Sequence, residues 1–451
     1  MKQMISSNNP ATQECRQKAQ QLQRKLWACA KRNKSRKFHA LYDRISRNDV
    51  LNEAYRRVKI RRGTYGVDGQ TIEEIEARGV EPFITGIENL LRNGRYTPKP
   101  VRRVMIPKAH GGERPLGIPT IRDRVVQMAA SIVLTPIFEA DFRGCSFGYR
   151  PKKTATDAME RIRKTSNSGK NYVLDADIKN FFNCIPHDIM LALVRKRISD
   201  RRVVKLIRQW LESGIMSDGV YQESTIGTPQ GGVISPLLSN IVLHEFDTVW
   251  EEQEGSWGTL TRFCDDFVIQ CVSHRQAEVV KWKVQNILSR LKLELHPQKT
   301  RIVNAGKGKG SFEFLGNQFK KMPSYRFAGM HFMNRWPSQK SQNKVRENIR
   351  NILSRKRFGV KNIRELVPEL NRVLQGWGNY FKYGNANRVF EKIDRYVNYR
   401  LGLFENRRRS TKWPHSLGGY TYEWYKSLGI HQLTGTVCYP KKSLVMVKAN
   451  A

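Results

Sequence analysis

The sequence lacks the features that mark several large classes of protein. No uninterrupted apolar run among its 451 residues approaches the roughly 20 residues that a helix needs to cross a bilayer. The N-terminus has no apolar core of a secretory signal. The seven cysteines form no C-x-x-C pair and are odd in number, which argues against a zinc ribbon and a disulfide framework. We therefore expect a cytoplasmic protein with reduced cysteines.

Acidic residues are scarce relative to basic ones. The chain has 80 Lys and Arg against 40 Asp and Glu, which gives a formal net charge of +40. The positive electrostatic field that this net charge creates favours a polyanionic partner. A phosphate backbone fits best, because neutralising phosphates releases condensed counterions. A merely soluble basic protein is the alternative. We expect nucleic acid, and no membrane, among the partners.

The hydrophobic content of 39% allows a large core, and the length favours more than one domain. Apolar spacing predicts a run of helices, at 13–62, from 71, and at 123–138, 188–213, 235–250 and 275–293. Alternating apolar residues and turn signals predict strands, at 98–119 as a hairpin and at 172–178 and 261–271, and a further apolar segment lies at 312–319. Ser235 and Pro236 are expected to cap and begin their helix. Beyond residue 336 the pattern changes to basic helix with spaced aromatics.

Two of the predicted β segments carry acids. Asp265 and Asp266 lie between two apolar runs, as at the tip of a hairpin. In the strand at 172–178, Asp175 and Asp177 face the same side, because side chains alternate along a strand. Converging carboxylates repel one another unless cations offset their charge, and Mg²⁺ is a hard ion that favours such oxygen ligands. Acids that merely end strands at the surface are the alternative interpretation.

Six further blocks accompany these acids. They lie at 114–127, 146–151, 228–241, 291–300, 312–316 and 374–381. Together with the acid-bearing strand and hairpin, they resemble the reverse transcriptases encoded by group II introns, in the form that lacks the C-terminal nuclease domain. The similarity covers nearly the whole chain. The block at 374–381 is similar to the maturase thumb of that family.

The resemblance implies an α+β fold in the form of a right hand, with fingers, an antiparallel-sheet palm and an α-helical thumb. It divides the chain into five regions. These are a basic helical N-terminal extension at 1–70, fingers at 71–170, a palm with the catalytic acids at 171–325, an α-helical thumb/maturase domain at 336–405 and a basic nucleic-acid-binding tail at 406–451.

The resemblance also implies a set of catalytic metal ligands. Asp177, Asp265 and Asp266 match the family's ligands, and Ile178 offers a main-chain carbonyl. Asp175 is the reserve candidate. Two Mg²⁺ ions are expected, with Mn²⁺ as a substitute, because such a pair can activate a primer 3′-hydroxyl and stabilise the departing pyrophosphate.

A second implied set binds the incoming nucleotide. Phe182 is expected to stand against the sugar and to leave no room for a 2′-hydroxyl. Lys108 and Arg114 flank the predicted hairpin turn, where cations could grip a triphosphate. Gln230 resembles a family residue that contacts the nucleotide, in a loop whose alternative interpretation is an ordinary turn. Lys299 could lie near the phosphates as a general acid, or could simply be a solvated lysine.

The segment beyond residue 336 is expected to bind a nucleic-acid duplex by contacting the sugar–phosphate backbone of that duplex. Trp377 and Phe381, four residues apart, are expected to pack inward. Arg407, Arg408 and Arg409 are the candidates for phosphate contacts. The resemblance implies that this region also binds the structured RNA of the parent intron.

The sequence departs from the family pattern at two places. Phe263 and Cys264 stand where the hairpin usually begins Tyr-Ala, which leaves the acids in place but makes primer positioning a question. His296 stands where the family commonly has Asn.

The function implied is that of an RNA-directed DNA polymerase, which extends a primer with dNTPs on an RNA template and binds its parent intron RNA to assist splicing and mobility into a DNA target. One alternative is a non-enzymatic RNA-binding splicing cofactor with a decayed polymerase, against which the intact acids argue. Another is a related reverse transcriptase recruited to CRISPR or phage defence.

Overall fold

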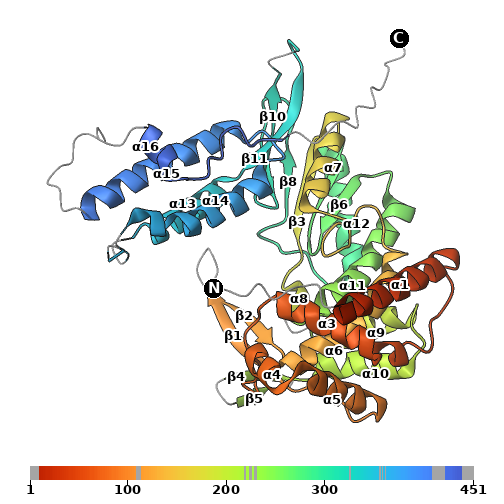
Figure 1. Ribbon diagram of the computed structural model, residues 1–451. Coiled ribbons are helices and arrows are strands. Elements are labelled where there is room, and N and C mark those ends of the chain that lie inside the picture. The colour runs from red at the N-terminus through yellow and green to blue at the C-terminus, as the bar shows by residue number, and fades with distance from the viewer. Residues whose placement is uncertain are drawn as a thin grey trace. The chain divides into compact units, whose positions relative to one another are not determined.

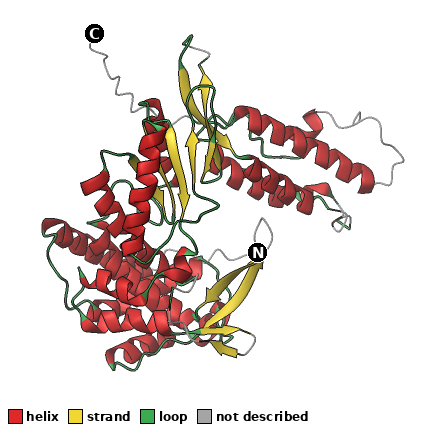
Figure 2. Ribbon diagram, turned by 180° about the vertical axis from the view of Figure 1, so that it is seen from behind, coloured by secondary structure: helices red, strands yellow, loops and turns green. Residues whose placement is uncertain are grey.

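The computed structural model describes residues 10–107, 113–217, 220–222, 226–227, 231–324, 327–354, 357, 359–360, 362–408 and 422–438. The chain divides into two compact units. Unit 1 comprises Met1–Thr154, Leu174–Ile269 and Arg275–Arg301, and unit 2 comprises Ala155–Val173, Gln270–His274 and Ile302–Ala451. Helices and antiparallel strands are both present, which confirms the expected mixture of helix and sheet (Figures 1 and 2).

The first part of unit 1 is helical, as the spacing of its apolar residues predicts. Its helices are α1 Pro10–Arg32, α2 Tyr42–Ile45, α3 Asn48–Ile60, α4 Ile72–Arg78, α5 Val80–Arg92 and α6 Ile121–Glu139. Helix α6 is apolar around most of its circumference and is buried accordingly, with α1 and α3 packed against it. Helix α4 begins with the capping box of Thr71 and Glu74, which satisfies two otherwise unpaired N–H groups.

A four-stranded sheet follows in unit 1, in the order β2-β1-β4-β5. Its strands are β1 Val101–Pro107, β2 Glu113–Ile118, β4 Ile215–Ser217 and β5 Val220–Gln222. Strands β1 and β2 pair antiparallel, with Arg102 opposite Ile118 and Pro107 opposite Glu113. The hairpin predicted at 98–119 is therefore confirmed.

Two helix predictions need correction. The helix expected at 188–213 is two helices, α9 His187–Arg195 and α10 Arg201–Glu212. The break occurs because Asp200 accepts hydrogen bonds from the N–H groups of Leu41 (2.8 Å) and Arg202 (3.0 Å), which makes it the N-cap of α10. Ser235 is the first residue of helix α11 (Ser235–Val249) rather than its N-cap, and Ile234 precedes it without a side-chain cap.

The acid-bearing segments belong to a second four-stranded sheet, in the order β6-β7-β3-β8. Its strands are β3 Tyr172–Asp177, β6 Thr259–Phe263, β7 Asp266–Cys271 and β8 Arg301–Asn304. Only two residues connect β6 to β7, so the predicted hairpin is confirmed. Helices α7 Ala155–Asn167, α8 Phe181–Cys184, η1 Trp250–Glu254 and α12 His274–Arg290 complete this stretch of the chain.

Unit 2 combines a three-stranded antiparallel sheet, in the order β11-β10-β9, with a helical bundle. Its remaining elements are β9 Phe312–Phe314, β10 Asn317–Pro323, β11 His331–Pro337, α13 Gln339–Ile352, η3 Ile363–Glu365, α14 Val367–Phe381, α15 Asn387–Arg408 and α16 Tyr422–Ser427. The rings of Trp377 and Phe381 lie 5.0 Å apart and pack on the bundle core, which confirms the inward packing. In the described part of the chain, no helix combines the length and the hydropathy needed to span a membrane.

Candidate active site

Strands β3 and β7 are neighbours in their sheet, and each carries acidic residues at one end. Asp177 is the last residue of β3, and Asp266 is the first residue of β7. Ala176 is buried, while Asp175 and Asp177 on either side of it are partly exposed. This is the alternation that the sequence predicted for the strand.

The four carboxylates interact electrostatically. Burial, together with repulsion from Asp175, Asp265 and Asp177, raises the pKa of Asp266 to about 7, while Lys299 acts in the opposite direction. A carboxyl group behaves in this way when it is desolvated beside like charges. The acids that the sequence singled out are therefore brought together in unit 1, including the reserve candidate Asp175.

Two basic side chains already contact this cluster. The Nζ atom of Lys299 lies 2.7 Å from Oδ2 of Asp177, and the Nε atom of Arg301 lies 3.0 Å from Oδ2 of Asp175. Lys299 was expected near substrate phosphates, and in this structure it contacts a carboxylate. Arg301 was not singled out from the sequence. In the sequence, the only indication of a role for Arg301 is its position two residues after Lys299. It begins a strand whose pairing partner cannot be read from the sequence.

The cluster can be tested as a site for divalent metal ions. Among the described residues, no three His, Cys, Asp or Glu side chains stand in a ready-made metal-binding group. Two of the carboxylates contact the cations of Lys299 and Arg301 instead. The donor set nevertheless consists of carboxylate oxygens whose mutual repulsion a divalent cation would offset. Asp177, Asp265 and Asp266 therefore fit such an ion in chemistry and charge.

Helix α8 follows β3 and carries two adjacent aromatic rings. Phe181 is buried, with 2% of its surface exposed. Phe182 is partly exposed, and the two ring centroids lie 5.3 Å apart in an edge-to-face contact. The buried ring of Phe181 supports its neighbour, so the side chain of Phe182 is the one that a ligand beside β3 could reach.

A loop from residues 226–227 is fastened to the segment after α8. The N–H of Gly227 donates to the carbonyl of Ile185 at 3.0 Å, and Nε2 of His187 lies 2.7 Å from the Gly227 carbonyl. Gly227 has φ of +87°, and a Cβ there would lie 2.7 Å from the carbonyl oxygen of Phe182. Only glycine fits such a position. His187 was not predictable as a site residue from the sequence, because its contact with Gly227 spans 40 residues.

The remaining candidates are only partly covered by the structure. Lys108, Gln230 and Arg409 lie outside the described residues. The backbone of Arg114 pairs with Ile106 in the β1–β2 hairpin. Arg407 is exposed near the end of α15, which also contains Arg408. His296, a departure from the family pattern, donates its main-chain N–H to the Asp177 carbonyl at 2.8 Å.

Comparison with known proteins bears on this geometry. Residues 106–329 match the family described as reverse transcriptase (RNA-dependent DNA polymerase), and residues 342–417 match the group II intron maturase-specific domain. The chain belongs to the group II intron-encoded reverse transcriptase and maturase family. Its enzymatic class is RNA-directed DNA polymerase, and all four acids lie inside the reverse transcriptase segment.

Individual relatives of this reverse transcriptase differ in length. Protein YkfC of Escherichia coli (strain K12) is 33% identical over 362 residues, which is 72% of this chain and 93% of YkfC. The group II intron-encoded protein LtrA of Lactococcus lactis subsp. cremoris is 35% identical over 213 residues, which is 47% of this chain and 35% of LtrA. An uncharacterized 91 kDa protein in the cob intron of Schizosaccharomyces pombe is 25% identical, across 76% of this chain and 50% of that protein.

Membership of the family also bears on the metal. Reverse transcriptases use divalent metal ions, and the carboxylate cluster is one group of described side chains whose charge suits such ions. The reverse transcriptase segment contains Cys264 with φ of +61° at the turn before Asp265. The departure from the family pattern therefore falls on a conformation that few non-glycine residues adopt.

Proposed function

We propose that this reverse transcriptase extends a primer with dNTPs on an RNA template, with Asp177, Asp265, Asp266 and the Ile178 carbonyl as ligands of two Mg²⁺ ions. The observation that carries the proposal is the electrostatic cluster of carboxylates at the ends of β3 and β7, within the segment that matches the family. When bound, the two ions would supply the Lewis acidity that activates the primer hydroxyl and stabilises pyrophosphate. Mn²⁺ is the expected substitute.

The chain's own side chains then position the substrate. Phe182 limits the space beside the sugar and selects dNTPs. Lys108 and Arg114 hold the triphosphate, and Gln230 contacts the nucleotide. Lys299, which pairs with Asp177 in this structure, would contact the phosphates of the bound nucleotide. The partly exposed ring of Phe182 and the exposed Lys299 support these roles.

The regions of the chain are proposed to act as parts of a right-handed polymerase. Residues 71–170 serve as fingers, 171–325 as the palm and 336–405 as the thumb and maturase domain. The extension at 1–70 and the tail at 406–451 bind nucleic acid. Unit 2 supports the separate thumb, because its helices share a hydrophobic core of their own.

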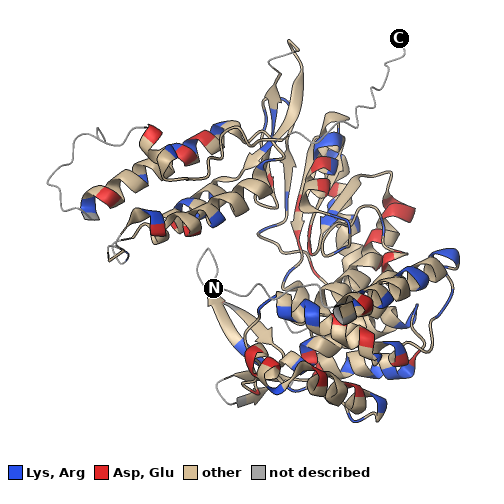
Figure 3. Cartoon of the chain, in the orientation of Figure 1, with Lys and Arg blue, Asp and Glu red and all other residues tan. Residues whose placement is uncertain are grey.

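The second proposed activity is binding of the parent intron RNA, which assists splicing and mobility. Lys and Arg occupy the helices of both units (Figure 3). Helix α13 illustrates the arrangement, since it buries Val345 and Ile349 while Lys340, Lys344 and Arg350 are exposed. An amphipathic basic helix of this kind offers phosphate contacts that depend on salt. The maturase-specific match at 342–417 supports the role.

Primer extension on poly(rA) with oligo(dT) and Mg²⁺ tests the polymerase. Asp265→Ala is expected to lower the rate by about 1,000-fold or more, since electrostatic stabilisation of the transferring phosphoryl group supplies most of the catalysis. Asp188→Ala is the matched control, because this acid is 72% exposed and contacts only Lys292 at 3.7 Å among its described ion pairs. Extension that persists in Asp265→Ala would contradict the assignment.

A further inference from the structure

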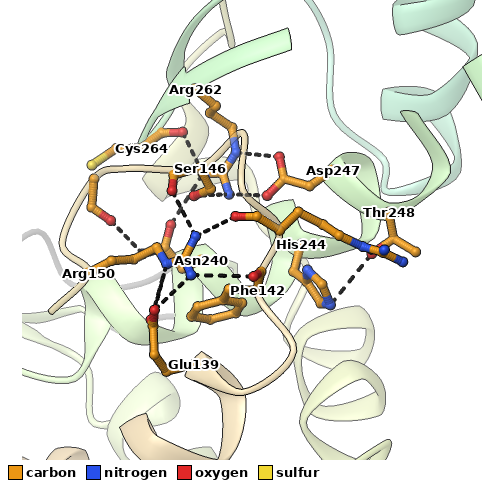
Figure 4. Close-up of polar contacts among 12 residues, drawn as sticks. Glu139, Phe142, Ser146, Arg150, Asn240, His244, Asp247, Thr248, Arg262 and Cys264 are labelled. Atoms are coloured by element: carbon orange, nitrogen blue, oxygen red, sulfur yellow. Dashed lines mark hydrogen bonds and ion pairs between the residues drawn. The ribbon is translucent and has the colours of Figure 1, made fainter. Parts of the chain in front are cut away.

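A fully buried ion pair lies beneath the β6–β7 hairpin. The guanidinium of Arg262 donates through Nε to Oδ1 of Asp247 at 2.7 Å and through Nη2 to Oδ2 of the same carboxylate (Figure 4). Both side chains are 0% exposed. Replacing such a pair with apolar residues is often neutral or stabilising. The pair therefore calls for an explanation other than stability.

The remaining hydrogen bonds of the Arg262 guanidinium reach three further residues. Nη1 donates to the carbonyl of Cys264 at 2.9 Å and to Oδ1 of Asn240 at 3.2 Å, and Nη2 donates to Oγ of Ser146 at 2.8 Å. Asp247 and Asn240 belong to the same helix, α11. One planar group thus connects a helix, a loop and the hairpin turn, which a lysine could not do with the same geometry.

Cys264 is the point at which this network meets the acids. It has φ of +61°, a backbone conformation that is unfavourable for a non-glycine residue and persists only where its surroundings hold it. Its carbonyl belongs to the peptide group that leads into Asp265. The hydrogen bond from Arg262 therefore fixes the orientation of the Cys264–Asp265 peptide group, which immediately precedes both acids.

Gly148 lies close against Cys264 of the same turn. A Cβ at this position would lie 2.5 Å from both the amide nitrogen and the Sγ of Cys264. The carbonyl of Gly148 accepts a hydrogen bond from Nδ2 of Asn240 at 2.9 Å. Asn240 therefore bonds both to the carbonyl of Gly148 and to Nη1 of Arg262, and so links the segment of Gly148 to the network around Cys264.

We infer that Arg262, oriented by Asp247 and Asn240, is a positioning residue that sets the direction of Asp265 and Asp266 through the carbonyl of Cys264. The inference rests on the proposed function, in which these two acids hold the metal ions. Arg262 touches neither substrate nor metal. Its effect is on how well the carboxylates converge, and so on the affinity for a divalent cation and on the turnover number.

Arg262→Lys tests the inference, because it keeps the charge for Asp247 and removes the fork. Mn²⁺ affinity is measured by water-proton relaxation, and kcat and the Mg²⁺ concentration at half-maximal rate by primer extension. We expect Mn²⁺ affinity to fall about tenfold and kcat to fall at least as much. Unchanged Mn²⁺ affinity and kcat in a folded variant would overturn the inference.

Arg197→Lys is the matched control for a buried arginine. Its side chain is 7% exposed, pairs with Asp141 at 3.2 Å and donates to the carbonyl of Ala30 at 3.1 Å, away from the hairpin. We expect it to lower the melting temperature and to leave Mn²⁺ affinity within twofold of wild type. An equal loss of Mn²⁺ affinity in this control would also overturn the inference, because a general loss of stability would then explain both.

Gly148→Ala decides the question if Arg262→Lys does not fold. The new methyl group displaces the Cys264 turn and leaves the Arg262–Asp247 pair intact, so Mn²⁺ affinity should again fall about tenfold. Normal Mn²⁺ binding by Gly148→Ala would refute the role of the turn. Failure of the proposed function is distinguishable, since the wild-type protein itself would then show no Mg²⁺-dependent extension.

Discussion

Lys299 and Asp177 form an ion pair across the candidate site, with Nζ 2.7 Å from Oδ2. The lysine side chain is 61% exposed and the aspartate 27%, and exposed pairs of this kind contribute only about 0.2–1 kcal/mol. A divalent cation that binds Oδ2 of Asp177 would displace this ammonium group. The lysine therefore competes weakly with the metal for one carboxylate.

Lys299→Gln should for this reason lower the Mg²⁺ concentration that gives half-maximal primer extension, by about two- to fivefold, which is the free energy of an exposed pair expressed as a ratio. The measurement is a Mg²⁺ titration at saturating dNTP. Lys292→Gln is the control, since Lys292 is 66% exposed and lies 3.7 Å from Asp188. A higher Mg²⁺ requirement in Lys299→Gln would mean that the lysine assists metal binding and does not oppose it.

Gly227→Ala should raise the KM for dNTP by at least about tenfold and leave Mg²⁺ dependence nearly unchanged. The added Cβ would lie 2.7 Å from the Phe182 carbonyl, at a φ of +87° that L residues rarely adopt. The clash displaces the segment that carries Phe182, against which the nucleotide sugar is proposed to stand. Steady-state kinetics with dTTP on poly(rA) measures the effect.

Gly86→Ala is the control for that substitution. Gly86 lies inside α5, and a Cβ there would meet nothing within 4 Å, so the change should stabilise the helix by about 0.5–1 kcal/mol and leave KM unchanged. An unaltered KM in Gly227→Ala would separate the 226–227 loop from nucleotide binding. His187→Asn, which removes the contact to the Gly227 carbonyl, should change KM in the same direction.

Local patterns in the sequence were sufficient for the elements that hold the acids. Three such patterns depend only on neighbours in the chain: the alternation in β3, the apolar runs around Asp265 and the mostly apolar α6. All three appear in the structure as predicted. The resemblance to group II intron-encoded reverse transcriptases is confirmed by the two family segments that the chain matches. These features can be predicted because the periodicity of strands and helices depends on residues that are close together in the chain.

Contacts between distant segments could not be recovered in the same way. The break before α10 depends on Asp200 accepting from Leu41, 159 residues away, and the apolar spacing on both sides of the break is compatible with one continuous helix. The pairing of Lys299 with Asp177 spans 122 residues. Register between strands decides which cation meets which carboxylate, and one sequence does not contain that information.

His244 predicts a pH dependence of stability. Burial lowers the pKa of its imidazole from 6.5 to about 4, with Arg143 and Arg262 adding to the effect and Asp247 and Glu245 opposing it. The folded state therefore favours the neutral ring. The contribution of the neutral ring to the free energy of unfolding is fully present above the unfolded pKa of 6.5. It is lost as the pH falls toward 4, by at most about 3 kcal/mol.

His244→Gln removes this titration, so the free energy of unfolding of the variant should fall less than that of wild type between pH 7 and pH 4.5. Urea unfolding at several pH values measures the difference. The exposed His39 supplies the control, and His39→Gln should follow the wild-type curve. Parallel curves for wild type and His244→Gln would show that the ring is not held neutral by burial.

A substitution of Arg407 tests whether unit 2 binds the phosphate backbone of RNA. Its side chain is exposed near the end of α15, and a phosphate contact there should release about one counterion. Arg407→Gln is then expected to weaken binding to a transcribed group II intron RNA about threefold or more at low salt and to reduce the slope of log K against log salt by about 1. Arg395→Gln, on the same helix, removes the same charge, but Arg395 is already paired with Glu391, so its effect should be smaller. Equal slopes for the two variants would mean that the general positive field, rather than a contact at Arg407, accounts for the affinity.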